Sequence, residues 1–234
     1  LGIHQFAVMG DSGGGPYAAV CAQQLSARLL GAALVSGVGP IDSTRGLQDI
    51  SKEDRQIMML ARWAPRLLAF LAQWPARTFR RDPARIMQQA IDTMPAADQA
   101  VFTDSAVRDA LTRSMQATFV NGTRGYAWSA RVYALDWGFR LEDIPMPIHI
   151  WHGEQDQSDA MRMVEDMMDR IPHRIPHIFP NEGHVSLLVN HAAEILEQLV
   201  QPPGASDPTP DTPPYMHPSD EPPCAPSSAP TPVA

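Results

Sequence analysis

The sequence has few cysteines, few basic residues and no long apolar run. Only two of its 234 residues are cysteine, Cys21 and Cys224, so a disulfide framework is excluded. No hydrophobic stretch reaches the roughly 20 residues that a membrane-spanning helix needs, and we expect no membrane span. No signal peptide is visible, and we therefore expect a cytoplasmic protein.

Positive charge and metal-ligand spacing are lacking as well. Lys and Arg number 18 against 26 Asp and Glu, which leaves a net charge of −8 and argues against a nucleic-acid partner. The eight histidines show no spacing typical of metal ligands, so we expect no metal and no other cofactor. The oligomeric state is left open.

Residues 201–234 differ in composition from the rest of the chain. They contain about half of the 23 prolines, no Lys or Arg and almost no large apolar side chain. Such a segment cannot bury enough surface to offset the entropy lost on ordering, so we expect a disordered tail. The remaining 200 or so residues suffice for one domain with a sizeable core.

A strand, a glycine turn and a helix are predicted at the start of the chain. The apolar run 6–9 predicts a buried strand, and the turn GDSGG (residues 10–14) leads into a helical pattern over residues 16–30. We expect Gly10 and Gly14 to lie where the strand and helix backbones leave no room for a Cβ atom. The core contacts expected of the helix are Tyr17, Val20, Leu25 and Leu29.

A second strand at residues 32–35 completes a predicted right-handed parallel βαβ unit. From residue 41 to about residue 121 only helical patterns occur, and Pro65 and Pro83 suit the first turns of two of these helices. We expect this insertion to be a lid, the alternative being an ordinary helical subdomain. In either case most of its large apolar residues should be buried: Met58, Met59, Trp63, Leu67, Phe70 and Trp74.

Two further strands are predicted near the end of the domain, at residues 147–151 and 174–179. The first runs into the loop HGEQD (residues 152–156), and the second leads to PNEGH (residues 180–184). Because Pro176 cannot donate to a ladder, its strand should lie at a sheet edge. Helices are expected at residues 159–170 and about 186–200.

The order of these motifs closely resembles the C-terminal two-thirds of a lidded α/β-hydrolase, over residues 1 to about 200. The resemblance implies an α/β fold with a parallel sheet flanked by helices, and active-site loops after the carboxyl ends of strands. The core would be 1–41 and 123–200, the lid 42–122 and the tail 201–234. The implied roles are nucleophile for Ser12, base for His184, acid for Asp156, oxyanion donor for Gly13, and elbow residues for Gly10, Asp11 and Gly14.

Other residues could take two of these roles. Glu154 and Asp143 are alternatives to Asp156, since the valine and proline that usually follow the acid in the family are replaced here by Gln157 and Ser158. Among the histidines, only His184 follows both a strand end and a turn glycine. The others are His4, His149, His152, His173, His177, His191 and His217.

The turn GDSGG followed by a proline also resembles the nucleophile region of chymotrypsin-like proteases. Those proteases are all-β, and their histidine and aspartate precede the serine in the chain. The helical pattern after Ser12, the extra glycine before Pro16 and the order of the motifs therefore favour the α/β-hydrolase.

The resemblance implies a serine hydrolase that cleaves ester- or amide-type bonds of small, largely apolar substrates through an acyl-enzyme. Peroxidase, aminopeptidase, thioesterase and carbon–carbon hydrolase reactions use the same triad and stay open. The family has about four strands and a loop with a second oxyanion donor before the elbow, so we expect a fragment with negligible turnover. The alternative is a non-catalytic remnant that acts as a binding module.

The composition of the tail predicts that deletion of residues 203–234 leaves the melting temperature nearly unchanged, because the segment has no apolar periodicity. Thermal unfolding of the full and shortened chains measures this. A fall of more than about 4 °C, the shift that about 1 kcal/mol produces in a chain of this size, would contradict the expectation.

Overall fold

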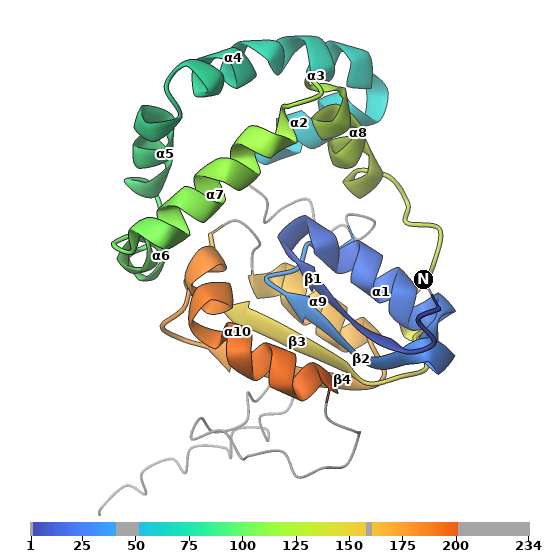
Figure 1. Ribbon diagram of the computed structural model, residues 1–234. Coiled ribbons are helices and arrows are strands. Elements are labelled where there is room, and N and C mark those ends of the chain that lie inside the picture. Colours follow the sequence, from blue (N-terminus) through green and yellow to red (C-terminus); the bar gives the residue numbers. More distant parts are fainter. Residues whose placement is uncertain (1, 41–51, 158–160, 201–234) are drawn as a thin grey trace, which may run out of the picture.

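The computed structural model describes residues 2–40, 52–157 and 161–200 (Figure 1). Its centre is a parallel sheet of four strands in the order β1-β2-β3-β4, which confirms the predicted α/β fold class. The predicted tail and the first part of the predicted lid lie outside the described residues. The strands are β1 (Phe6–Asp11), β2 (Leu29–Val35), β3 (Ile148–Gly153) and β4 (Arg174–Phe179).

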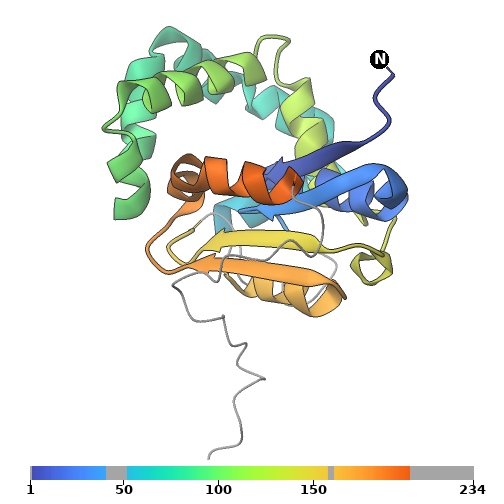
Figure 2. The same cartoon turned by 60° about the horizontal axis from the view of Figure 1, so that its bottom comes forward.

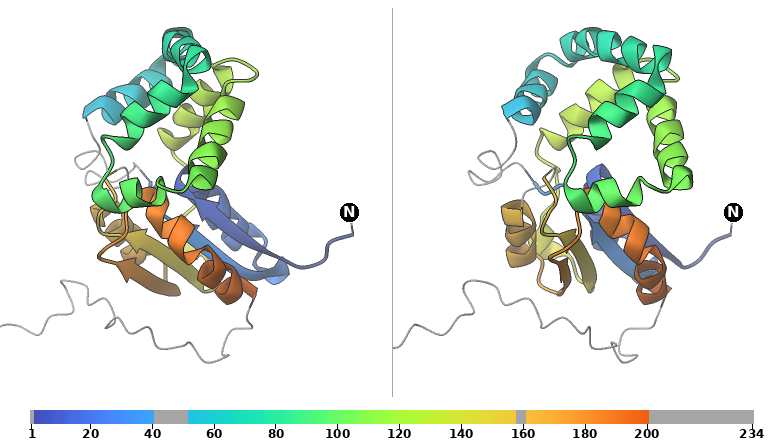
Figure 3. Two further views of the ribbon diagram at one scale, coloured as in Figure 1. Left: turned by 60° about the vertical axis from the view of Figure 1, so that its left-hand side comes forward. Right: turned by 90° about the vertical axis from the view of Figure 1, so that its left-hand side faces the viewer.

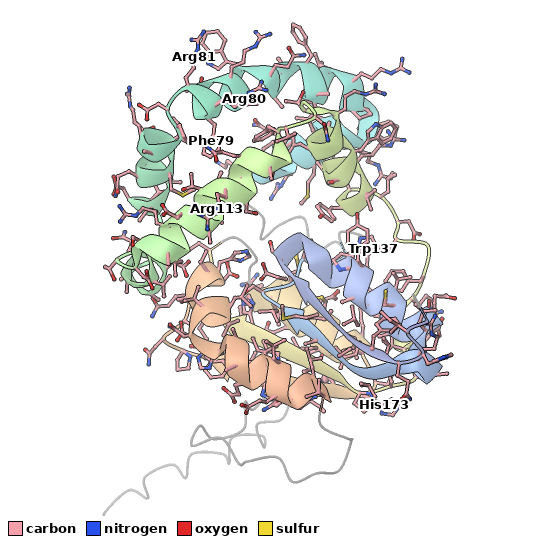
Figure 4. The ribbon with its side chains drawn as sticks, viewed as in Figure 1. Phe79, Arg80, Arg81, Arg113, Trp137 and His173 are labelled. Atoms are coloured by element: carbon pink, nitrogen blue, oxygen red, sulfur yellow. The ribbon has the colours of Figure 1, made fainter. Side chains whose placement is uncertain are left out.

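Helices cover both faces of this sheet (Figure 2). On β2, Ala32 and Leu34 pack with α1 (Gly15–Gln24) and α9 (Met161–Arg170), whereas the alternate residues Ala33 and Val35 pack under α10 (His184–Val200). Successive side chains of a strand point to opposite faces, so a continuous apolar run serves both layers. Trp137, which Figure 4 shows beside α1, packs against the first of these two cores.

Small residues, rather than the large ones expected, form the buried face of α1. The helix ends at Gln24, Leu29 already belongs to β2, and Tyr17 is exposed. A Cβ on Gly10 would overlap the carbonyl oxygen of Gly14 and lie 2.8 Å from the Cβ of Ala18. The backbones approach so closely that only small side chains fit between them, namely Ala18, Ala19 and Ala22.

The same close approach was expected at Gly14, and there the expectation is wrong. A Cβ on Gly14 would meet no atom within 4 Å among the described residues. The prediction for Pro176 is confirmed, because β4 is an edge strand and Pro176 faces Ile150 of β3. The other edge of the described sheet is β1.

Seven helices form a block that stands over one end of the sheet (Figures 1 and 3). Pro65 and Pro83 begin two of them, as predicted. We call residues 52–133 the helical block. Its helices are α2 (Lys52–Trp63), α3 (Pro65–Leu71), α4 (Gln73–Arg81), α5 (Pro83–Ile91), α6 (Ala96–Val101), α7 (Ser105–Thr118) and α8 (Arg124–Tyr133).

Most of the large apolar residues that were expected in the core of this block are instead exposed. Trp63 and Trp74 are 74% and 79% exposed, and Met59, Leu67 and Phe70 are exposed as well. Phe70 and Trp128 line an open groove of about 440 Å³ between α3 and α8. Phe79 is buried in the block, whereas Arg80, Arg81 and Arg113 are exposed (Figure 4). Within the described part of the chain, no helix combines the length and apolarity needed to cross a bilayer.

The contact between β1 and α1 predicts that Gly10→Ala lowers the free energy of unfolding by about 1–3 kcal/mol, because the added methyl group overpacks the interface. Gly125→Ala is the matched control. It lies within α8, and a Cβ there meets nothing within 4 Å, so this change should stabilise by about 0.5–1 kcal/mol. Urea unfolding measures both, and a Gly10→Ala variant as stable as the parent would contradict the packing described.

Candidate active site

Ser12 lies in the sharp turn between β1 and α1, in a backbone conformation that is unfavourable for serine. Its φ is +50°, in the left-handed region, which costs of the order of 1 kcal/mol or more for a residue with a Cβ. The Ser12 carbonyl accepts a hydrogen bond of 3.1 Å from the Val38 N–H, in the loop after β2. The loop after β2 therefore helps to hold the turn in this conformation.

The structure brings Asp156 and His184 together, 28 residues apart in the chain. His184 Nδ1 lies 2.7 Å from Asp156 Oδ2, and the Asp156 side chain is fully buried. Because a carboxylate only accepts, Nδ1 carries the proton in this hydrogen bond. His184 was expected in the loop after β4, but it is the first residue of α10.

Main-chain contacts between two loops bring this pair together. In the loop after β3, the Glu154 N–H donates to the carbonyl of Phe179, the last residue of β4, at 3.0 Å. The Gln155 N–H donates to the Glu182 carbonyl, in the loop after β4, at 2.9 Å. A Cβ on Gly153 would overlap the carbonyl oxygen of Glu182. The loops after β3 and β4 thus lie directly against each other, which only a glycine at position 153 allows.

The turn that contains Ser12 is close enough to this pair for its charges to interact with them. The Asp11 side chain is partly exposed, yet partial burial raises the pKa of its carboxyl. His184 lowers this pKa and Asp156 raises it further, so all three groups share one region. The structure therefore places the predicted turn and the Asp156–His184 pair on the same side of the sheet, at the carboxyl ends of the strands.

The alternative histidines and acids have different surroundings. His152 is 1% exposed, and burial lowers its pKa, so its imidazole stays neutral. His191 lies within 3.4 Å of Glu182 and 3.1 Å of Glu194. Glu154 and Asp143 are exposed. Among the described residues, no group of three or more His, Cys, Asp or Glu side chains is placed to hold a metal ion.

Two residues of the helical block reach this region, and sequence analysis missed both. Tyr133, at the end of α8, places its hydroxyl where a Cβ of Gly13 would lie. Burial raises the pKa of Tyr133, and the nearby Tyr17 raises it further, so its hydroxyl stays protonated. Asp98, on α6, accepts a 3.1 Å hydrogen bond from the His184 N–H. No local pattern signals either contact, because each depends on how the whole block folds back onto the sheet.

Ser36 is a third residue that was missed, at the end of β2. It is fully buried and has a φ of +44°. Its N–H donates to the Trp151 carbonyl at 2.9 Å, and its hydroxyl lies 3.4 Å from the His184 carbonyl. Ser36 therefore links β2 both to β3 and to the start of α10.

Aromatic rings stack along β3 and β4 beneath the two loops. The ring centroids of Trp151 and His177 are 4.0 Å apart and the rings are nearly parallel, and the Phe179 ring, also nearly parallel to Trp151, lies 5.8 Å from it. His177 Nε2 lies 3.0 Å from His149 Nδ1. Burial, together with the neighbouring His149, lowers the pKa of His177 to about 4.

The fold and the order of the motifs agree with the family comparison. The family model of the alpha/beta hydrolase fold matches residues 1–191, and the chain belongs to this family. A search among curated proteins found no match.

Solved structures with this fold include several enzymes at low sequence identity. A bacterial membrane phospholipase A, described as a virulence factor, is 16% identical with a TM-score of 0.53, and the match covers 85% of this chain and 57% of that one. An esterase from Thermogutta terrifontis is 17% identical, with a TM-score of 0.52 and coverages of 83% and 64%. A bromoperoxidase from Bacillus anthracis is 15% identical, with a TM-score of 0.53 and coverages of 82% and 64%. The chain thus spans about three-fifths of the length of these structures, and at such identities the likeness shows the fold alone.

The lowered pKa of His177 predicts a stability that falls as the pH drops from about 6.5 to about 4. The folded chain keeps this imidazole neutral down to about pH 4, whereas the unfolded chain takes up a proton near pH 6.5, so unfolding binds a proton between these values. Between these two pH values the free energy of unfolding should fall by about 1–3 kcal/mol.

The measurement is urea unfolding at several pH values between 4 and 8. His177→Phe keeps an aromatic ring in the stack but cannot titrate, so it should flatten the dependence on pH. His173→Phe is the control, because His173 is exposed and lies just before β4 (Figure 4). If the free energy of unfolding of His177→Phe depended on pH as steeply as that of the parent, His177 would not be the group responsible.

Proposed function

We propose that this chain is a serine hydrolase in which Ser12 is the nucleophile, His184 the general base and Asp156 the acid that orients the histidine. The observation that carries the proposal is the 2.7 Å hydrogen bond between His184 and the fully buried Asp156. A buried carboxylate on Nδ1 favours the tautomer in which Nδ1 carries the proton, and in this tautomer Nε2 is the basic nitrogen that can accept a proton. The strained turn at Ser12 supports the same assignment, since nucleophilic serines of this fold occupy such turns.

The reaction would proceed in two stages. Ser12 Oγ attacks the carbonyl carbon of the substrate while its proton passes to His184 Nε2, and the Gly13 N–H stabilises the negative oxygen that forms. His184 then gives the proton to the leaving alcohol or amine, which leaves an acyl group on Ser12. A water molecule, deprotonated by His184, releases the acid and restores the serine. These steps require no metal and no cofactor.

We assign the role of a lid over this site to the insertion 42–122, of which residues 52–122 are described. We add α8, which was assigned to the core but packs against α2 and α3. The Tyr133 hydroxyl beside Gly13 would form part of the wall against which the substrate carbonyl lies. The substrates proposed are small, largely apolar esters or amides, in keeping with the many apolar side chains of the block. The esterase and phospholipase among the similar structures support this class.

Labelling with a fluorophosphonate probe tests the proposal, because the probe forms a covalent bond only with an activated serine. Folded parent protein should be labelled at Ser12, as located by mass spectrometry, and Ser12→Ala should not be labelled. His184→Ala should slow labelling by about 10²–10⁴-fold, the usual contribution of a general base.

Two histidine variants serve as matched controls. His152→Ala and His191→Ala remove the neighbouring imidazoles and should label at rates close to the parent. Normal labelling of His184→Ala together with loss in either control would show that the base is assigned wrongly. Folded parent protein without any label at Ser12 would favour the non-catalytic binding module instead.

A further inference from the structure

The first turn of α10 is capped by a carboxylate from the helical block. Asp98 Oδ1 accepts from the Val185 N–H at 2.9 Å and from the Ser186 N–H at 2.8 Å, while Oδ2 accepts from the His184 N–H at 3.1 Å. The first N–H groups of a helix have no partner within the helix itself. One side chain therefore satisfies three of them.

This cap is divided between two segments of the chain. In a capping box, the residue before the helix supplies the acceptor, and the third helical residue bonds back to its N–H. The residue before α10 is Gly183, which has no side chain, and its N–H donates to Ser186 Oγ at 2.8 Å. Asp98 supplies the missing acceptor, and its carboxylate lies so close that a Cβ on Gly183 would be 2.5 Å from Oδ1.

The Asp98 carboxylate is buried, and its hydrogen bonds go to the first turn of α10. Asp98 is 2% exposed, and no salt bridge to it is found among the described residues. A buried carboxylate is costly unless hydrogen bonds satisfy it, and bonds from N–H groups at the positive end of a helix are among the stronger ones. Beside it, Val185 packs against the apolar cluster of Met87, Ile91 and Phe102.

We propose that Asp98 is a positioning residue. It fixes the first turn of α10, and thereby keeps the His184 ring at hydrogen-bonding distance from Asp156. The inference rests on the proposed function. Two carboxylates hold His184, since Asp98 accepts from its main-chain N–H and Asp156 accepts from its ring. Asp98 acts on the reaction only through this contact, and an error of about 1 Å in the placement of a catalytic group can cost about a hundredfold in rate.

The test compares Asp98→Ala with Asp104→Ala. Asp104 also caps a helix of the block, by accepting from the Ala106 N–H at 2.7 Å, but it is exposed and caps α7 rather than α10. Two readouts are used: the downfield proton NMR signal of His184 Nδ1–H, which reports the bond to Asp156 without any turnover, and the rate of fluorophosphonate labelling at Ser12. Circular dichroism verifies that each variant is folded.

Asp98→Ala should lose or broaden the NMR signal and slow labelling by about a hundredfold, whereas Asp104→Ala should change neither. Asp98→Asn keeps one acceptor oxygen but presents an NH₂ group to one of the three N–H donors, so it should slow labelling at least about tenfold, less than Asp98→Ala. If Asp98→Ala does not fold, Asp98→Asn serves as the test.

A parent-like signal and parent-like labelling in a folded Asp98 variant would overturn the inference. A parent that shows the NMR signal but no labelling would instead count against the proposed function alone.

Discussion

The direct backbone contact between the loop after β3 and the loop after β4 determines the geometry of the candidate site. Gly153 lies against the Glu182 carbonyl, and the hydrogen bonds beside it fix how far each loop projects. The carboxyl ends of parallel strands lie on the same side of the sheet, but that alone does not fix the distance between two side chains that follow them. The contact between the loops fixes it, so Asp156 and His184 meet at hydrogen-bonding distance.

Much of this arrangement could be predicted from the sequence, because it follows from local patterns. Apolar runs and turn glycines located β1, β3 and β4 to within a few residues, and the motif order placed Asp156 and His184 after neighbouring strands. The buried face of α1 was predicted wrongly, because hydrophobic periodicity favours large side chains. The close approach at Gly10 selects alanines there instead.

The contacts from the helical block could not be predicted in the same way. α6 has only six residues and no apolar stripe that would have marked it, and Asp98 in its sequence resembles an ordinary surface acid. Its burial results from the packing of α6 against α10, far away in the sequence. The exposed Trp63 and Trp74 illustrate the same point, since composition alone assigned them to a core that the block does not build around them.

The divided cap at α10 also bears on how such proteins diversify. Insertions between core strands are where members of a fold family differ most freely, and exchanging one is a simple evolutionary route to a new specificity. In this chain the insertion carries the acceptor for a core helix, while the core supplies a glycine with no acceptor of its own. A block inherited from a relative would therefore have to bring a carboxylate to the same place, or the core would need a new side chain at position 183. The insertion and the core are thus constrained to change together at this contact.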